Sequence, residues 1–358
     1  MLCKRFTSID FIIKREDKTV VTICDVAREA GVSQATVSRV LNRKKTNIPI
    51  SEKTIKKVLE AAERLNYAPN RAARNLRTGS TNSIGFLLCE RPFSNQHYYV
   101  MLKHLESELA KKGRNLLFSI YNPKEELPQM IRERAVDGLF LAGKVTKSIV
   151  EKVQKSNVPF IVLGSMTDEA CDINIVSSDI TNSITMAYDY LLKNGHRDIL
   201  YFSDYKEPLL IEKIYIACKE VYKKQDLSPR TDLIKTNLKD PYFTINEILS
   251  EHPEVTALII QQHYVNVIMR ILEQKQLNIP EQMSLIIFGD ESLDSWQREY
   301  YTYISSATKE LVECGVGNIL KICKGEEDRV DMLVRGELFQ GTTVKQIPAR
   351  TLSKEMVL

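Results

Sequence analysis

The chain lacks the long apolar segments and nucleotide-binding loops that mark two large classes of protein. Its 358 residues contain no run of 18 or more apolar residues, which excludes a typical transmembrane helix. No GxGxxG loop follows a predicted strand, and no GxxxxGK[ST], GxSxG or HExxH motif occurs, so the common phosphate-binding and hydrolase motifs are missing. The nearest match, Gly315-Val-Gly317, lies inside a helical pattern and is interpreted as packing. We therefore expect neither an enzyme nor a membrane protein.

Cysteine and histidine are scarce and dispersed. The seven cysteines form no CxxC pair, and the five histidines form no cluster, so we expect no disulfide, metal site or cofactor. Among the histidines, His196 in a Gly-His-Arg turn is interpreted as structural. The first twenty residues lack the apolar core and cleavage site of a signal peptide, and a cytoplasmic location is predicted.

The segment Thr22–Asn42, TICDVAREAGVSQATVSRVLN, is typical of two short helices joined by a tight turn. Thr22 and Asp25 have the spacing of a helix cap and the acid that reaches back to it. Gly31 ends the first helix, and Ser33 caps the second. Apolar residues recur at helical spacing in both. The polar face of the second helix suits base edges and phosphates in a DNA major groove, although an ordinary solvated helical hairpin would show the same pattern.

A third helix and a short basic segment follow. SEKTIKKVLEAAERLN begins at Ser51, and Ile55, Val58 and Leu59 start an apolar stripe. The next segment, YAPNRAARNLR, carries three arginines and one prominent apolar residue, Leu76. It is about two turns long, which makes a helix marginal alone in water. A basic segment with one apolar wedge suits a DNA groove better than a protein interior.

The charge distribution favours the same interpretation. Residues 1–80 hold 17 Lys and Arg against 8 Asp and Glu, a net charge of +9. Residues 81–358 hold 33 against 38, a net charge of −5. A basic amino-terminal fifth on an acidic body is the expected electrostatic footprint of a DNA-binding arm, although basic tails also bind RNA and membranes.

From Thr22 to Gly85 the sequence resembles the lactose/galactose repressor family. The resemblance runs through TICDVAREAGVS-ATVSRVLN and VLEAAERLNYAPNRAARNLRTGSTNSIG, and continues more weakly to about residue 345. It implies a homodimeric transcriptional regulator that binds double-stranded operator DNA of pseudo-palindromic sequence. It also implies a hinge helix that inserts a leucine into the minor groove, a position that Leu76 occupies here, and a small-molecule effector that changes DNA affinity.

The residues expected to contact DNA come from the cap of the first helix, the recognition helix and the hinge segment. They are Thr22, Ser33, Gln34, Ala35, Thr36, Ser38, Arg39, Asn42, Asn70, Arg71, Arg74 and Leu76. Gln pairs with adenine, Ala contacts the thymine methyl group and Arg suits guanine, so the first exposed residues of the recognition helix are expected to read bases.

From residue 83 onward short apolar runs alternate with helical segments, which predicts parallel sheets flanked by helices. The expected fold is α/β: a three-helix helix-turn-helix domain and hinge helix, then a core of two lobes like a periplasmic binding protein. We expect an extension at 1–20, the DNA-binding domain at 21–66, the hinge at 67–81 and the core at 82–358. Within the core, lobe 1 is expected at about 82–178 and 305–325, and lobe 2 at about 179–304 and 326–358. The last strands, around MLVRGE and TTVKQI, are expected to close lobe 2.

The resemblance also implies effector-binding positions facing the cleft between the lobes. They are Tyr98, Lys213, His263, Asp290 and Trp296. Most depart from the family pattern. The first position is Tyr98, or Tyr99 if the frame is shifted by one, and the family's proline is absent there. Lys213 replaces an arginine, His263 replaces the acid of an Asn-Asp pair, and Asp290 is shifted by one place. Lysine keeps the charge but loses the bidentate fork of arginine. The ligand is therefore not the family's usual sugar, or the site has decayed.

The sequence therefore predicts a homodimeric repressor of carbohydrate-utilisation genes that responds to a sugar or sugar phosphate. Two alternatives stay open: a ligand-independent DNA-binding regulator whose core only dimerises or docks a protein, and a sugar-binding module with an unrelated head. The tail after Pro348 is shorter than a tetramerising coiled coil, so a dimer is expected. Residues 1–20 are either a genuine arm or the product of a start codon assigned upstream of the true one, at Val20 or Val21.

Overall fold

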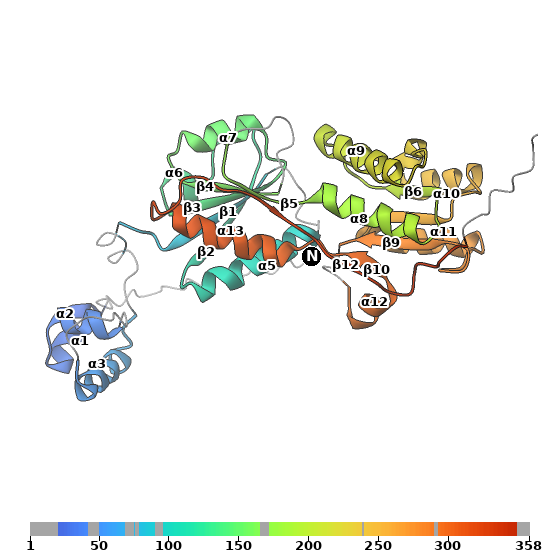
Figure 1. Cartoon of the computed structure of the whole chain (residues 1–358). Coiled ribbons are helices and arrows are strands. Elements are labelled where there is room, and N and C mark those ends of the chain that lie inside the picture. The colour runs from blue at the N-terminus through green and yellow to red at the C-terminus, as the bar shows by residue number, and fades with distance from the viewer. Residues whose placement is uncertain are drawn as a thin grey trace, which may run out of the picture. The chain divides into compact units, whose positions relative to one another are not determined.

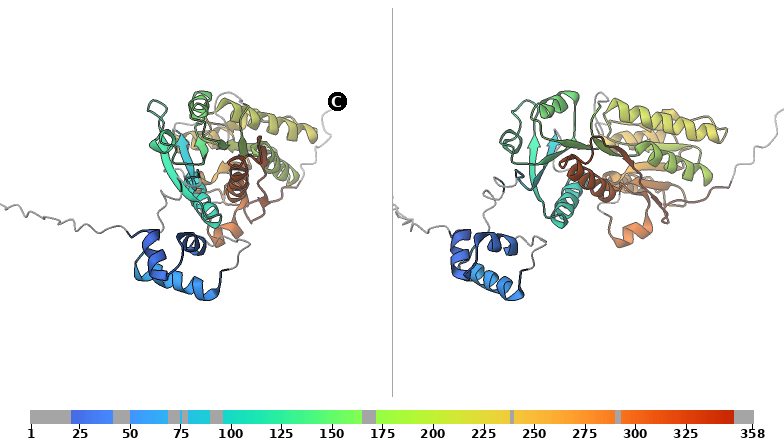
Figure 2. Two further views of the ribbon diagram at one scale, coloured as in Figure 1. Left: turned by 90° about the vertical axis from the view of Figure 1, so that its left-hand side faces the viewer. Right: turned by 60° about the vertical axis from the view of Figure 1, so that its left-hand side comes forward.

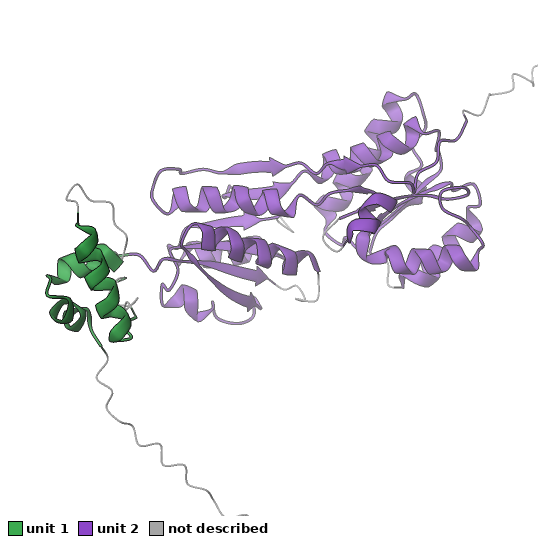
Figure 3. Ribbon diagram, turned by 90° about the horizontal axis from the view of Figure 1, so that it is seen from below, with its two compact units in different colours: residues 1–79 green, residues 80–358 purple. Residues whose placement is uncertain are grey.

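The computed structural model describes most of the chain, and structural statements below refer to that part. It comprises residues 21–41, 50–68, 75, 79–89, 96–164, 172–237, 240–289 and 293–348. The chain divides into two compact units, residues 1–79 and 80–358, which Figure 3 colours separately. Within the described ranges, no helix has the length and apolarity needed to cross a bilayer.

In residues 21–41 and 50–68 of unit 1, three helices pack around a small common core (Figure 2). They are α1 (Ile23–Ala30), α2 (Gln34–Leu41) and α3 (Glu52–Arg64). The core consists of buried alanines and valines from all three: Val26, Ala27, Ala30, Val37, Val40, Val58, Ala61 and Ala62. The predicted stripe of α3 is partly wrong, because Ile55 and Leu59 are 36% and 50% exposed. Two short partner helices cover only one side of α3.

The local signals for this unit are the ones expected from the sequence. The carboxylate of Asp25 accepts hydrogen bonds from the backbone N–H and the hydroxyl of Thr22, at 2.9 and 2.7 Å. Gly31 takes the left-handed conformation, φ +64°, that ends many helices. Ser33 Oγ accepts from the N–H of Thr36 at 3.2 Å, and Ser51 Oγ accepts from that of Thr54 at 3.3 Å. These caps fix the turn that sets α2 against α1.

Unit 2 contains two lobes, each a six-stranded sheet between helices (Figure 1). The first sheet is entirely parallel, in the order β11-β5-β4-β3-β1-β2. Its strands are β1 (Ser83–Cys89), β2 (Asn115–Tyr121), β3 (Gly138–Gly143), β4 (Phe160–Leu163), β5 (Ile175–Ser178) and β11 (Asp331–Val334). One face is covered by α5 (Gln96–Lys111) and α13 (Thr308–Ile322), the other by α6 (Gln129–Arg132) and α7 (Lys147–Gln154).

The second sheet has the order β12-β10-β9-β8-β6-β7, and only β12 is antiparallel. Its strands are β6 (Ile199–Phe202), β7 (Ile234–Lys235), β8 (Ala257–Gln261), β9 (Ser284–Phe288), β10 (Thr302–Ile304) and β12 (Leu338–Phe339). Helices α8 (Ile180–Lys193) and α9 (Pro208–Lys224) pack on one face. Helices α10 (Pro241–Glu251) and α11 (Val265–Gln274) pack on the other, and α12 (Ser295–Tyr300) precedes β10. Two 3₁₀ turns, η1 (Thr231–Leu233) and η2 (Gln262–Tyr264), complete this lobe.

As predicted, helix α13 packs on the first lobe, because its apolar face is buried there. Leu311, Val312 and Val316 are buried against the first sheet. The packing interpretation of Gly315-Val-Gly317 is confirmed at Gly315, where a Cβ would lie 2.7 Å from a methyl carbon of Leu163 in β4, but not at Gly317, where a Cβ would meet nothing within 4 Å. The missing side chain of Gly315 lets the helix approach the strand closely.

Three crossovers connect the lobes, and hydrogen bonds hold them side by side. The N–H of Asp179, after β5, donates to the carbonyl of Val334, at the end of β11, at 2.8 Å. The hydroxyl of Ser178 contacts the carbonyl of Ser306 at 3.5 Å. The Arg335 guanidinium lies 3.4 Å from the Asp179 carboxylate. Because the three crossovers lie side by side, the two lobes can rotate relative to each other about this crossover region.

The prediction for the last strands is wrong in two respects. The MLV segment forms β11 in the first sheet, beside β5, and not in the second lobe. The TTVKQI segment forms no regular strand, although Leu285 donates to the carbonyl of Thr343 at 2.8 Å. After α13 ends on the first lobe, only a short link leads to β11, and Val330 pairs with Asn174 and Ile175 there. That short link keeps β11 in the first sheet.

Candidate nucleic-acid interface and effector site

The described part of the predicted DNA interface is the capped start of α2. Gln34 and Ala35 open the helix and are exposed, as are Thr22 and Ser33 in the two caps. Thr36, Ser38 and Arg39 follow on α2 and are half-buried. The first turn of a helix presents unpaired N–H groups, which favours phosphate oxygens nearby. The predicted residues of caps and recognition helix thus lie on one small unit.

Two hydrogen-bonding contacts orient polar side chains on the exposed face of α2. Gln34 Nε2 donates to Cys24 Sγ at 3.0 Å, which joins the exposed faces of α2 and α1. Arg39 Nε lies 3.4 Å from the carbonyl of Ala35, one turn earlier on the same helix. The contact of Gln34 with Cys24 was not expected from the sequence, because helical periodicity within one segment carries no information about which side chains meet across a turn.

The carboxylate of Asp25 stabilises the fold of this unit by capping the start of α1. Hydrogen bonds from the side chain and backbone of Thr22 hold its pKa below the usual range, and Arg28 adds to that effect from 3.1 Å. The charge of Asp25 near the start of α1 also interacts favourably with the helix dipole. Six of the predicted site residues lie outside the described residues: Asn42, Asn70, Arg71, Arg74, Leu76 and Asp290.

In the second lobe, polar groups gather where β6 and β8 end. Asp204 follows β6, and its N–H donates to the side-chain oxygen of Gln261, the last residue of β8, at 3.0 Å. His263 Nε2 lies 3.7 Å from the Asp204 carboxylate. Burial lowers the pKa of His263, and the charge of Asp204 opposes that effect. The carboxyl ends of parallel strands are where ligands bind in open α/β sheets.

Tyr98 of the first lobe interacts with this group through Tyr205. Tyr205 follows Asp204, and burial raises the pKa of Tyr205 to about 12. Asp204 and Tyr98 add to that shift, because each lies close enough to repel the phenolate. Next to Tyr98, the ring of His97 lies 3.4 Å from the hydroxyl of Thr308 at the start of α13. Tyr98 therefore lies within electrostatic range of Tyr205, whereas His263 lies beside Asp204.

The other two described effector positions, Lys213 and Trp296, are exposed side chains on helices of the second lobe. Lys213 is exposed within the second turn of α9. Trp296, on α12, is 59% exposed, and its ring centroid lies 6.1 Å from that of Tyr300. Their roles in binding stay predictions.

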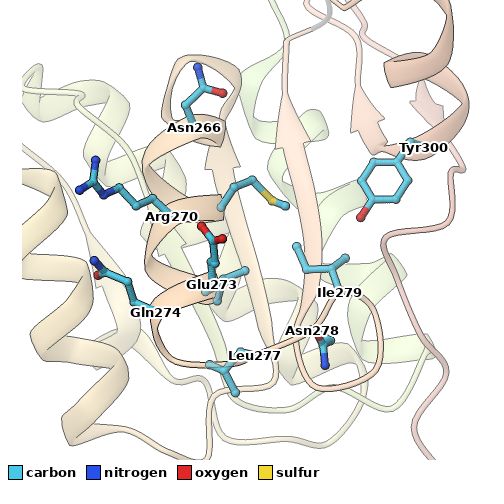
Figure 4. A pocket seen from close by; sticks show the side chains of 10 residues that line it. Asn266, Arg270, Glu273, Gln274, Leu277, Asn278, Ile279 and Tyr300 are labelled. Carbon is cyan, nitrogen blue, oxygen red and sulfur yellow. The ribbon is translucent and has the colours of Figure 1, made fainter.

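A pocket of about 820 Å³ lies elsewhere on the second lobe, along α11 and the loop after it (Figure 4). Its walls combine apolar and charged side chains: Asn266, Met269, Arg270, Leu272, Glu273, Gln274, Leu277, Asn278, Ile279 and Tyr300. None of Tyr98, Lys213, His263 and Trp296 lines it. His263 precedes α11, whereas the pocket extends to the loop beyond its carboxyl end. We therefore place the candidate effector site at the strand ends and not in this pocket.

Asp204, Tyr205 and Gln261 were not among the site residues predicted from the sequence, although they supply most of the polar groups at the strand ends. One signal was available: SDY directly follows the apolar run ILYF, and parallel strands place such residues at one edge. Within the described ranges, no cluster of three or more His, Cys, Asp or Glu is arranged to hold a metal ion.

Two family models match the chain. The model for bacterial regulatory proteins of the lacI family matches residues 22–70. The model for periplasmic binding proteins and the sugar-binding domain of the LacI family matches residues 81–315. The two matches together cover the three-helix unit and most of the two-lobed unit.

The chain is similar to regulatory proteins, and the matches cover most of the length of these relatives. Catabolite control protein A of Priestia megaterium is 29% identical over 79% of this chain and 87% of its own. The HTH-type transcriptional repressor PurR of Vibrio vulnificus is 27% identical over 92% of this chain and all of its own. Among solved structures, the lac repressor dimer bound to operator and an anti-inducer has a TM-score of 0.72 at 21% identity, covering 91% of this chain and 99% of that one. A LacI family regulator from Enterococcus faecium with bound ribose has a TM-score of 0.62 at 19% identity, covering 74% of this chain and all of that one. The predicted fold is thereby confirmed.

Proposed function

Because this chain belongs to the lacI family of bacterial regulatory proteins, and is a DNA-binding transcriptional regulator and not an enzyme, we propose that it represses carbohydrate-utilisation genes. It does so as a homodimer on a pseudo-palindromic operator, under the control of a small polar effector. In this proposal residues 21–66 are the DNA-binding domain, 67–81 the hinge, and the chain from residue 82 the effector-binding and dimerisation core.

The observation that carries the proposal is the capped helix-turn-helix in unit 1. Gln34 and Ala35 are exposed at the start of α2, and Ser33 caps it at 3.2 Å. An α-helix fits the B-DNA major groove, and its amino-terminal side chains then reach base edges. The net charge of +9 on residues 1–80 supplies the salt-dependent attraction to phosphates.

The effector proposal is supported by the polar side chains at the strand ends. Asp204 and Gln261 offer acceptors for ligand hydroxyls, Tyr98 and Tyr205 offer hydroxyls and aromatic faces, and His263 lies 3.7 Å from Asp204. Such a mixture of aromatic surface and a few polar groups suits a sugar ring. In a sugar phosphate, the anionic group would pair with Lys213 as a point charge. The ribose held by the similar Enterococcus faecium regulator motivates including pentoses in any screen.

The dimer proposal is supported by apolar side chains exposed on α5 and β2. Tyr99, Phe118 and Ile120 are 56%, 38% and 53% exposed. β2 is an edge strand of the first sheet, and an exposed apolar edge invites association with another chain. Dimerisation would also present two recognition helices to two half-sites one helical turn apart.

Operator selection from a random DNA pool tests the DNA-binding part. The protein should enrich a two-fold symmetric sequence, and its affinity for that sequence should exceed its affinity for random DNA by at least about 10³-fold. The affinity should fall steeply with salt, because phosphate contacts release counterions. Enrichment of an asymmetric sequence, or of none, would contradict a dimer reading a pseudo-palindrome.

Thermal-shift measurements with sugars and sugar phosphates test the effector part. A compound that binds only the native state raises the melting temperature, by mass action. The compound that does so should also weaken binding to the selected operator. If no sugar or sugar phosphate changes the melting temperature while operator binding is intact, the core acts without a ligand, and dimerisation or docking of a partner becomes its role.

A further inference from the structure

The contact between Cys24 and Gln34 links the two helices of the DNA-binding unit on their exposed side. Cys24 is the second residue of α1, and Gln34 is the first residue of α2. The amide nitrogen Nε2 of Gln34 donates to Cys24 Sγ at 3.0 Å, although ten positions separate the two residues. Both side chains are exposed. A surface glutamine normally samples several rotamers, so a defined partner distinguishes this one.

The fold itself sets the distance between the two residues. Gly31 ends α1 in the left-handed conformation, and its N–H bonds to the carbonyls of Ala27 and Arg28. Ser33 then caps α2 through the N–H of Thr36 at 3.2 Å. The buried Val26 and Val37 pack the helices together beneath the contact. The backbone therefore presents Cys24 to Gln34 without any contribution from DNA.

The chemistry of the contact leaves the base-reading groups of Gln34 available. Glutamine recognises adenine by donating one N–H to N7 and accepting from the N6 amino group. Its Nε2 carries two hydrogens. One of them is directed at Cys24 Sγ, and the other N–H and Oε1 remain for the base. Sulfur is a weak acceptor, so Cys24 restrains the amide plane without competing strongly with a base.

We propose that Cys24 is a positioning residue for DNA recognition: it orients the Gln34 amide before binding and thereby strengthens the preference for adenine at one base pair in each half-site. Ordering a free glutamine side chain on binding costs conformational entropy, and a preformed contact removes part of that cost. The inference rests on the proposed function, because it requires Gln34 to read a base.

The test compares Cys24→Ala and Cys24→Ser in the full-length protein on DNA selected by the unchanged protein. Each affinity is measured on the selected operator, on the operator with adenine replaced at the base pair most affected by Gln34→Ala, and on random DNA. Cys24→Ala should lose about three- to tenfold in discrimination between the first two, the size of one modest hydrogen bond. Cys24→Ser, which keeps an acceptor, should retain most of it. Affinity for random DNA should not change.

Two controls make the result specific. In a Gln34→Ala background, Cys24→Ala should have no further effect on discrimination, because its partner is gone. Cys314→Ala makes the same thiol-to-methyl change in unit 2, at a half-buried thiol, and should leave discrimination unchanged. Circular dichroism melting of each variant establishes that the three-helix unit is folded.

Each outcome bears on one claim. If Gln34→Ala leaves base preference unchanged, the base-reading part of the proposed function is wrong. If Gln34→Ala changes the preference but Cys24→Ala does not, or if Cys24→Ala weakens operator and random DNA equally, the positioning role is overturned while the proposed function stands.

Discussion

Arg39 is the recognition-helix residue whose contribution to base reading is easiest to isolate. It lies one turn after Ala35, with its Nε 3.4 Å from the Ala35 carbonyl. An arginine that donates two hydrogen bonds to guanine contributes about 1–3 kcal/mol of discrimination. We therefore expect Arg39→Ala to cost about 1–3 kcal/mol of operator affinity and to relax the preference at one base pair per half-site.

Random DNA is the control for Arg39, measured by fluorescence anisotropy at one fixed salt concentration. A side chain that reads a base should matter on the operator and little on random sequence. Equal losses on both kinds of DNA, with a shallower salt dependence, would show that Arg39 only neutralises a phosphate.

His196 should make the stability of the second lobe depend on pH. It is 1% exposed; its Nδ1 lies 2.9 Å from Thr256 Oγ1, and its Nε2 lies 3.0 Å from the carbonyl of Lys345. The neutral ring fits both contacts, with Nε2–H donating to the carbonyl and Nδ1 accepting from the hydroxyl. Burial lowers the pKa of His196, and the charge of Arg197 lowers it further. The unfolded chain therefore takes up a proton more readily than the native protein, and the stability contributed by His196 is lost as pH falls below about 6.5.

Urea unfolding at pH 7.5, 6.5 and 5.5 measures this effect. The free energy of unfolding should decrease toward pH 5.5, and His196→Gln should flatten that decrease because it removes the titrating ring. His263, whose pKa is also lowered by burial, contributes in the same direction and stays in both proteins. Parallel pH profiles for the parent and the variant would contradict the assignment to His196.

At the level of single residues, the sequence predicts interactions between residues that are close together along the chain. The caps by Thr22 and Ser33 and the turn at Gly31 follow from residue types at fixed offsets. The contacts of Gln34 with Cys24 and of Asp204 with Gln261 join different elements, and no spacing rule in one chain specifies such pairs. The sequence pattern could place Asp204 and Tyr205 at a strand end, because they directly follow an apolar run, but it could not indicate that Gln261 pairs with Asp204 there.

At the level of elements, hydrophobic patterning suffices for most of the core. β1 is buried at every position and β8 at all but its last, and such apolar runs are typical of parallel strands. β11 shows where patterning fails. Its residues Met332 and Leu333 are 45% and 61% exposed, so burial does not specify its sheet. The position where α13 ends decides that β11 pairs with β5.

The carboxylate of Asp137 anchors the first residues of unit 2. It accepts hydrogen bonds from the hydroxyl of Ser80 at 2.5 Å, from the N–H of Thr81 at 2.6 Å and from the N–H of Asn82 at 3.0 Å. Arg114 pairs with it at 2.9 Å. Burial by itself raises the pKa of Asp137, but the hydrogen bonds from Ser80, Thr81 and Asn82 outweigh it and hold the pKa below its usual value. This anchor fixes the chain that follows the hinge to the first lobe.

Asp137→Asn should therefore destabilise unit 2. The amide replaces an acceptor oxygen with a donor that faces other donors, which costs about 1–3 kcal/mol for an unsatisfied buried group. Urea unfolding of the variant at pH 7 measures the loss. Asp172→Asn is a matched control, because its carboxylate is 94% exposed although it pairs with Arg329, and such pairs contribute about 0–1 kcal/mol. Equal stabilities for the two variants would argue against the anchor.

We predict that the hinge segment, residues 70–77, takes on its role only when it is bound to DNA. Residues 70–77 are basic, with Leu76 as the prominent apolar side chain, and an apolar wedge in the minor groove bends DNA. Leu76→Ala should reduce both the bend and the specific affinity while the melting of the three-helix unit stays unchanged. The bend is measured by the mobility of circularly permuted operator fragments. An unchanged bend angle and affinity would remove Leu76 from the mechanism.

At the scale of the whole molecule, regulation requires two arrangements of the lobes that a ligand distinguishes. A ligand changes DNA affinity only through different affinities for the two arrangements. The three crossovers meet at Asp179, Ser306 and Arg335, so a rotation there changes the distance between the strand ends of the two lobes. Tyr98 on one lobe and Tyr205 on the other are close enough to interact electrostatically. A ligand at these strand ends would therefore bind the two arrangements unequally.

Substitutions at the proposed effector site should separate ligand response from DNA binding. Lys213→Ala and Asp290→Ala remove groups predicted to hold the ligand, and neither residue belongs to the DNA-binding unit. Both variants should keep operator affinity within about threefold of the parent and should lose the response to the compound that raises the parent's melting temperature. His263→Gln tests the strand-end group directly, because it removes the ring that lies 3.7 Å from Asp204. If all three variants release operator at the same compound concentration as the parent, the compound binds elsewhere, and the pocket along α11 becomes the next position to substitute.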